Sequence, residues 1–171
     1  MRAENGRLRS ESYTKPYTVD VIISDHEEIV CKFAENIDEI TRSEPAAEDE
    51  ESEARKVFVF DRYTLTLPFR TGLAEEIKKN PAEWLRMAKQ QDFETKSAEV
   101  RAKRNALLEA SDNEFCIDRI ISEMSSVSTT ALTAKLKELS TGKMAAYRQA
   151  LRDITNQPQF PYTVTFPIKP N

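Results

Sequence analysis

The chain has 171 residues, of which 39% are hydrophobic and 32% charged, with a mean hydropathy of −0.60. A chain of this length buries about two-thirds of its unfolded surface, so a core needs no metal or disulfide. No apolar run approaches the ~20 residues of a membrane span, and we expect neither a signal peptide nor membrane association. Three glycines and one histidine leave no Gly-rich phosphate loop and little scope for histidine chemistry or zinc binding.

The net charge of −4 and the pI near 5.3 argue against nucleic acid as a main partner. The two cysteines, Cys31 and Cys116, lie far apart and outside any C-x-x-C. Two reduced thiols are the favoured interpretation, and a single disulfide between them is the alternative.

The N-terminal part predicts a small antiparallel sheet. Residues 1–16 are polar and are expected to form a mobile arm. Residues 17–24 alternate between apolar and polar, and alternation resumes at Ile29, Cys31 and Phe33, which predicts a hairpin with a turn near His26. Residues 36–40 are expected to leave the second strand.

Residues 42–55 crowd six carboxylates around a proline and predict a solvated acidic loop. The spacing of a calcium-binding loop is absent, so we expect no metal site there. Residues 56–67 return to strand character, either as two strands with a turn at Asp61-Arg62 or as one long strand. The sheet domain is therefore expected to span residues 17–72 and to contain three or four strands.

After Gly72 the apolar period becomes helical. Asn80, Pro81 and Glu83 form a helix-start signal, and residues 81–110 predict one long helix that either projects or meets a partner. Its cations, Lys96, Arg101, Lys103 and Arg104, alternate with glutamates, which is typical of a salt-bridged surface.

Residues 111–114 resemble a second capping box, and three further helices are expected up to residue 156, with their apolar stripes forming a core. Residues 157–171 hold four prolines and predict an extended tail. The fold class is therefore α+β: a small antiparallel sheet, a long helix, a helical cluster within 73–156, and an extended Pro/aromatic tail over 157–171.

Nothing in the sequence assembles a catalytic constellation. His26 has only acidic neighbours in an expected turn, and the motifs of serine hydrolases, P-loop nucleotidases and zinc proteases are absent. We expect no enzyme activity, no cofactor and no metal.

The C-terminal part resembles phage tail assembly chaperones. Residues 104–112 are similar to that family's R-x-x-L-L-x-x-S-D block, and residues 147–153 to its Y-R-Q-A-L-R-D block. Residues 157–161 and 166–170 resemble its closing Q-P-x-F-P and W-P-x-K-P blocks. Asn113, Met144 or Ala145, and Phe166 stand where the family usually has Trp. The resemblance covers roughly residues 100–171.

The resemblance implies a non-enzymatic accessory of tail or tail-fibre assembly that binds a phage tail or tail-fibre protein in the host cytoplasm. The alternatives are a structural tail or baseplate component retained in the virion tail, and a small host-directed inhibitor. A homo-oligomer is left open. The candidate partner-binding residues are Tyr147, Arg148, Leu151, Arg152, Phe160, Phe166 and Pro167.

Overall fold

The computed structural model describes residues 3–24, 27–43, 54–124 and 126–170. The chain divides into two compact units, Met1–Thr95 and Lys96–Asn171. The division falls inside helix α2 (Pro81–Asp112), because the first turns of this helix pack on the sheet of the N-terminal unit. Each unit is described by itself.

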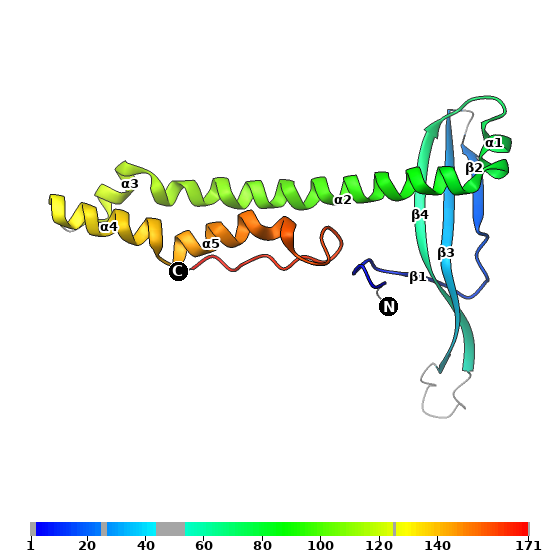
Figure 1. The fold of residues 1–171 in the computed structure, drawn as a ribbon, viewed down its shortest axis with the longest axis horizontal. Coiled ribbons are helices and arrows are strands. Elements are labelled where there is room, and N and C mark those ends of the chain that lie inside the picture. The colour runs from blue at the N-terminus through cyan, green and yellow to red at the C-terminus, as the bar shows by residue number, and fades with distance from the viewer. Residues whose placement is uncertain (1–2, 25–26, 44–53, 125, 171) are drawn as a thin grey trace. The chain divides into compact units, whose positions relative to one another are not determined.

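The N-terminal unit is built on a four-stranded antiparallel sheet (Figure 1). Its strands are β1 (Ser10–Ser12), β2 (Val19–Ser24), β3 (Glu28–Ser43) and β4 (Ala54–Pro68), in the order β1-β4-β3-β2. With the helices that follow, the sheet confirms the predicted α+β class. Asp61 and Arg62 lie within β4, so the one-strand alternative is the correct one.

Strand β3 is longer than expected. The prediction that residues 36–40 leave the strand is wrong, because β3 passes through a bulge there and continues to Ser43. The pairing shifts between Glu35 and Asp38, and Asn36 takes a left-handed conformation with φ 50°. Asparagine tolerates this region better than most residues, so one extra residue is accommodated without ending the ladder.

The predicted acidic loop and mobile arm also contain strand residues. Arg42 pairs with Arg55 and Ser43 with Ala54, so the ends of the proposed 42–55 loop belong to β3 and β4. Its central residues, 44–53, lie outside the described part of the chain. Within residues 1–16, β1 pairs with β4 from Ser10↔Phe60 to Ser12↔Phe58, and the mobility of this arm stays a prediction.

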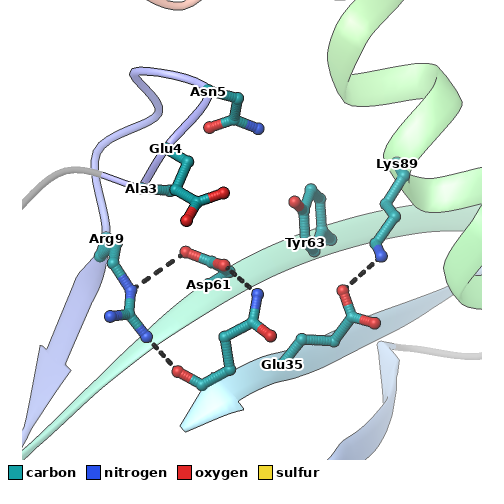
Figure 2. Close-up of a pocket in the computed structure, with 9 residues that line it drawn as sticks. Ala3, Glu4, Asn5, Arg9, Glu35, Asp61, Tyr63 and Lys89 are labelled. Atoms are coloured by element: carbon teal, nitrogen blue, oxygen red, sulfur yellow. Dashed lines mark hydrogen bonds and ion pairs between the residues drawn. The ribbon is translucent and has the colours of Figure 1, made fainter. Parts of the chain in front are cut away.

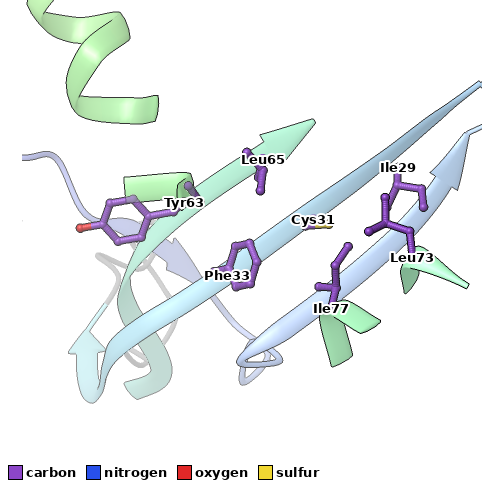
Figure 3. Packing of buried hydrophobic residues seen from close by; sticks show 8 residues of the cluster. Ile29, Cys31, Phe33, Tyr63, Leu65, Leu73 and Ile77 are labelled. Carbon is purple, nitrogen blue, oxygen red and sulfur yellow. The ribbon is translucent and has the colours of Figure 1, made fainter. Parts of the chain in front are cut away.

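One face of the sheet is covered by helix α1 (Leu73–Lys79) and the start of α2. Figure 3 shows the packing, in which Leu73 and Ile77 of α1 lie against Ile29 of β3. The cluster is completed by Cys31, Phe33, Tyr63, Leu65 and Ala88. The side chains that alternate along β3 and β4 therefore face the helices, as period-two alternation predicts.

The C-terminal unit is helical. After α2 come the 3-10 turn η1 (Asn113–Phe115), α3 (Ile117–Ser122), α4 (Thr129–Thr141), α5 (Lys143–Arg152) and the 3-10 turn η2 (Asp153–Asn156). These confirm the expected long helix and the helices after it.

The second capping box is wrong. Ser111 and Asp112 belong to α2, and Ser111 Oγ donates to the Leu108 carbonyl 2.6 Å away instead of capping a new helix. Helix α3 begins later, after Cys116, without a side-chain cap. The motif was present, but the long helix continued through it.

The tail is only partly extended. Residues 157–163 form turns, with hydrogen bonds from the Phe160 amide to the Gln157 carbonyl and from the Tyr162 amide to the Gln159 carbonyl. The side-chain amide of Gln157 also donates to the Thr165 carbonyl and accepts from the Thr165 backbone N–H, each at 2.8 Å. Residues 164–170 have no regular secondary structure.

Candidate functional site

Arg148 of helix α5 contacts the end of helix α2 within the C-terminal unit. Its guanidinium lies 2.6 Å from an Asp112 carboxylate oxygen and donates to Ser111 Oγ. The same group lies over the Phe115 ring, 4.9 Å from the ring centre. With its side chain only 17% exposed, Arg148 mainly fastens α5 to the end of α2.

Tyr147 and Leu151 lie in the interior. Four residues apart on α5, they share a helix face, and they are 5% and 0% exposed. Ile154, in the next turn, is also fully buried. Tyr147 and Leu151 of α5 and Ile154 of η2 are therefore core side chains, and a partner cannot contact Tyr147 or Leu151 in this structure.

The tail lies against α2 through pairs of cations and rings. The Arg101 guanidinium is 5.6 Å from the centre of the Phe160 ring, and the Lys103 ammonium is 4.4 Å from that of Phe166. Both phenylalanines are partly buried. The tail therefore contacts α2 at two aromatic positions, and Figure 1 shows it running beside α5.

An ion pair fixes the end of the tail. Lys169 Nζ lies 2.8 Å from a carboxylate oxygen of Glu114, which also contacts Arg119 at 3.2 Å. The hydrogen bond from Lys169 is the main cause that lowers the pKa of Glu114 below its usual value. The carboxylate form of Glu114 is therefore the form that the folded tail prefers.

The remaining sequence candidates lie nearer the surface. Arg152 is exposed and Pro167 is partly buried. Pro167 follows Phe166, whose ring contacts Lys103 of α2. A role for Arg152, Phe166 or Pro167 in partner binding stays a prediction.

Sequence reasoning missed a set of exposed apolar side chains. The residues after α2 were expected to form a core, yet several large apolar groups there face solvent. Ile120 is buried, but its neighbours on α3, Ile117 and Ile121, are 65% and 38% exposed. The exposed apolar set, as we call it, consists of Phe115, Ile117, Ile121, Val127 and Leu136. Periodicity located the helices correctly, but it cannot reveal whether another element covers their apolar face.

The N-terminal unit has a polar cavity of about 580 Å³ between the arm and the β3 bulge (Figure 2). Arg9 and Asp61 form a buried ion pair there, with 3.2 Å between Nε and Oδ1 and side chains 8% and 6% exposed. Asn36 donates to Asp61 at 2.7 Å, and Arg9 also pairs with Asp38 at 2.6 Å. Arg9 Nε and Asp61 Oδ1 form no hydrogen bond despite this ion pair, and the contacts of Arg9 with Asp38 and Asp61 connect the arm to the sheet.

Tyr63 lies at the side of this cavity between two cations. The Arg7 guanidinium is 4.1 Å from the ring centre and the Lys89 ammonium 5.5 Å. Burial is the main cause that raises the pKa of Tyr63, so the phenol stays protonated at neutral pH. Both cations also form ion pairs: Lys89 pairs with Glu35, and Arg7 pairs with Asp92 at 3.0 Å.

The described residues contain no candidate metal site, and both cysteines are free. No group of three His, Cys, Asp or Glu side chains is placed to hold a metal ion among the described residues. His26 lies outside those residues. Both cysteines are free: Cys31 is buried, which raises the pKa of its thiol, and Cys116 is exposed. Among the described residues, no helix is long and apolar enough to span a membrane.

The cations of α2 differ from the predicted salt-bridged surface. Lys96 does pair with Glu99, at 2.8 Å. Arg101 and Lys103 instead lie over aromatic rings, and Arg104 hydrogen-bonds Asn105. The difference arises because Phe160 and Phe166 of the tail contact Arg101 and Lys103. From the helix sequence alone, these two cations would be expected to face solvent or pair with neighbouring glutamates.

The C-terminal unit coincides with the part of the chain that matches a known protein family. Residues 97–171 match the family described as phage tail assembly chaperone protein. The family region, as we call these residues, begins within α2 and contains the whole of the C-terminal unit except its first residue. Comparisons with curated proteins and with solved structures give no match.

The sequence blocks that carry this likeness contact one another within the family region. The Ser-Asp pair at 111–112 binds Arg148 of the Tyr-Arg-Gln block. The Gln-Pro block opens with Gln157, which binds the Thr165 backbone just before the final Phe-Pro block. The blocks therefore fit together as parts of one folded unit.

Proposed function

We propose that this chain is a phage tail assembly chaperone that binds a tail or tail-fibre subunit without catalysing a reaction. The single observation that carries the proposal is the match of residues 97–171 to the phage tail assembly chaperone family. Among the described residues no group of three His, Cys, Asp or Glu side chains is placed to hold a metal ion, which is compatible with a binding role.

The binding surface we propose is the exposed apolar set. Five large apolar side chains facing solvent on a small helical unit are typical of a protein-interaction surface rather than of a sealed core. Ile117 and Ile121 lie four residues apart on α3 and share one face, to which an apolar segment of a tail subunit can pack. Phe166 and Pro167 of the tail form a second proposed contact.

The charge of the chain supports solubility of such a complex. The N-terminal unit has 14 Lys and Arg against 21 Asp and Glu, whereas the C-terminal unit has 11 against 8. An excess of negative charge outside the binding unit keeps a complex with an aggregation-prone subunit dispersed. The host cytoplasm, where tails are assembled, is the proposed location.

Co-expression with tail and tail-fibre subunits tests this function. Ile117→Ser is expected to reduce co-purification of the subunit at least tenfold with an unchanged melting temperature. Leu8→Ser is the matched control, since Leu8 is 69% exposed but belongs to the N-terminal unit. Equal binding by both variants would exclude the exposed apolar set, and no binding by the wild-type chain to any tail or fibre subunit would exclude the function.

Mass spectrometry of purified virions separates the proposal from its structural alternative. A chaperone is released on assembly and is therefore expected to be absent from the finished particle. Recovery at a stoichiometry comparable to that of tail proteins would favour a retained tail or baseplate component.

A further inference from the structure

Strand β2 leaves one edge of the N-terminal sheet open. It is the last strand in the order β1-β4-β3-β2, so a single neighbour, β3, pairs with it (Figure 1). The opposite edge is covered differently: β1 pairs with part of β4, and the Arg7 guanidinium donates to the Arg62 carbonyl beyond it. Helix α1 contacts β2 on the face that carries Val19 and Val21, but no strand among the described residues pairs with the outer edge of β2.

The pairing register shows which backbone groups of β2 point outward. The Ala34 amide donates to the Thr18 carbonyl at 3.1 Å, which makes Thr18 and Ala34 a hydrogen-bonded pair. Because such pairs alternate in antiparallel sheets, Asp20 and Ile22 also bond to β3. The N–H and C=O groups of Val19, Val21 and Ile23 therefore point away from the sheet.

The side chains of β2 lack the features that usually protect an edge strand. Natural edges carry prolines, bulges or inward charges. Strand β2 has neither proline nor bulge, and Asp20 is its single charged residue. Ile22 and Ile23 are 40% and 47% exposed. An apolar, regular edge of this kind is suited to pairing with another strand.

We propose that β2 pairs antiparallel with β2 of a second copy of this chain, about a two-fold axis at Val21. In this register Val21 faces Val21 of the second copy, and Val19 faces its Ile23. All the outward backbone groups then find partners, with two hydrogen bonds for each of three facing pairs. The two four-stranded sheets become one continuous sheet across the dimer.

The charge pattern favours a second copy as the occupant. In this register Asp20 faces Ile22 of the other chain rather than its Asp20, so no like charges oppose each other. The facing pairs on the helix-covered side are all β-branched, which is a favourable combination across strands. The strand is thus complementary to itself in both backbone and side chains.

The dimer is expected to be weak, because a six-residue edge buries less than a standard interface. Sedimentation equilibrium from about 10 μM to 1 mM is therefore the first measurement, and dimerisation with a Kd within this range is expected. A chain that stays monomeric at the highest concentration overturns the proposal.

A matched pair of variants tests the register. Ile22→Asp places a carboxylate opposite Asp20 of the other copy twice, and Ile22→Lys places an ammonium there. Both remove the same half-exposed side chain, so their effects on the monomer are similar. The Kd of the Asp variant is expected to exceed that of the Lys variant about tenfold. Equal or reversed affinities would overturn the proposed register.

Amide hydrogen exchange supplies an independent readout. Raising the protein concentration is expected to slow exchange at Val21 and Ile23, whose amides point outward, but not at Ile22, whose amide already bonds β3. Uniform or absent protection along β2 would contradict edge pairing. The proposal does not depend on phage tail assembly, and co-purification with a tail subunit leaves it unaffected.

Discussion

The two units of this chain bury their apolar residues to different extents. In the N-terminal unit, alternating side chains of β3 and β4 meet α1 and α2 in a continuous cluster with Ile29, Cys31 and Ile77 fully buried. In the C-terminal unit the core is narrower, and the exposed apolar set faces solvent. The sheet unit therefore has the larger buried core, although both units expose large apolar side chains, among them Ile22 and Ile23 of β2 in the N-terminal unit.

The largest expected effects come from removing one core side chain in each unit. Phe33→Ala and Leu151→Ala should each lower the free energy of unfolding by about 3–5 kcal/mol, because both side chains are at most 1% exposed. Trp84, the single tryptophan, packs against the sheet cluster and reports on the N-terminal unit by fluorescence. We expect Phe33→Ala to shift the Trp84 transition and Leu151→Ala to shift the loss of helical circular dichroism while leaving Trp84 unaffected. A shared shift of both signals would mean that the units unfold together.

Removal of one partner from the buried Arg9–Asp61 ion pair should have the next largest effect on the free energy of unfolding. Asp61→Ala leaves the Arg9 guanidinium buried with only Asp38 as a charged partner, at an expected cost of about 3 kcal/mol. The double variant Arg9→Met with Asp61→Leu removes both charges and should recover more than half of that loss in urea denaturation. If the double variant is less stable than Asp61→Ala, the packing of the arm on the sheet requires the charged groups themselves.

A smaller effect is expected for the aromatic residues of the tail. Phe160→Ala and Phe166→Ala should each destabilise the C-terminal unit by about 1–2 kcal/mol, since both rings are partly buried and contact a cation. If Phe166 also binds a tail subunit, its variant alone should reduce co-purification. Equal destabilisation with undiminished co-purification would assign the whole tail a structural role.

The smallest effect concerns the ion pair at the end of the tail. The pKa of Glu114 is lowered in the folded state, so its contribution is complete above the ordinary value of 4.5 and is lost as the pH falls through the lowered pKa. Lys169→Met should therefore cost about 0.5 kcal/mol at pH 7 and almost nothing near pH 2. Melting curves at the two pH values check this, and an equal loss at both would exclude Glu114 as the cause.

The fold was predictable where the period of the apolar residues agrees with local signals such as helix-start residues. Alternation located β2 and both halves of β4, and Asn80 with Pro81 marked the start of α2. The β3 bulge was not predictable, because its residues 36–38 interrupt the alternation as a loop would. Strand β1 was missed for a related reason: three polar residues pair with β4 without any apolar pattern of their own.

The candidate site was predicted less completely. The resemblance correctly marked the C-terminal residues, and its blocks do meet through Arg148 and Gln157. It did not distinguish buried from accessible members, so Tyr147 and Leu151 were proposed for a surface although they lie in the core. Ile117 and Ile121 are exposed because no other described element covers their face of α3. The helical period of apolar residues shows which residues share a face, but it does not show whether another element covers that face.

The bulge at Asn36 absorbs the one residue by which β3 exceeds β4 between Glu35 and Asp38. Before the bulge, Phe33 and Glu35 oppose Tyr63 and Asp61; after it, Asp38 and Ile40 oppose Val59 and Val57. Deleting Asn36 would leave Ile37 alone opposite Phe60, so Asp38 would still oppose Val59 and the later residues of β3 would keep their faces. The loss would be local, namely the hydrogen bond from the Asn36 side chain to Asp61 and the contact of the Asn36 carbonyl with Arg9. A one-residue deletion in a regular stretch of the strand, at Lys32 for example, would instead move the residues on one side of it to the opposite face, so a deletion is expected to be tolerated better at the bulge than there.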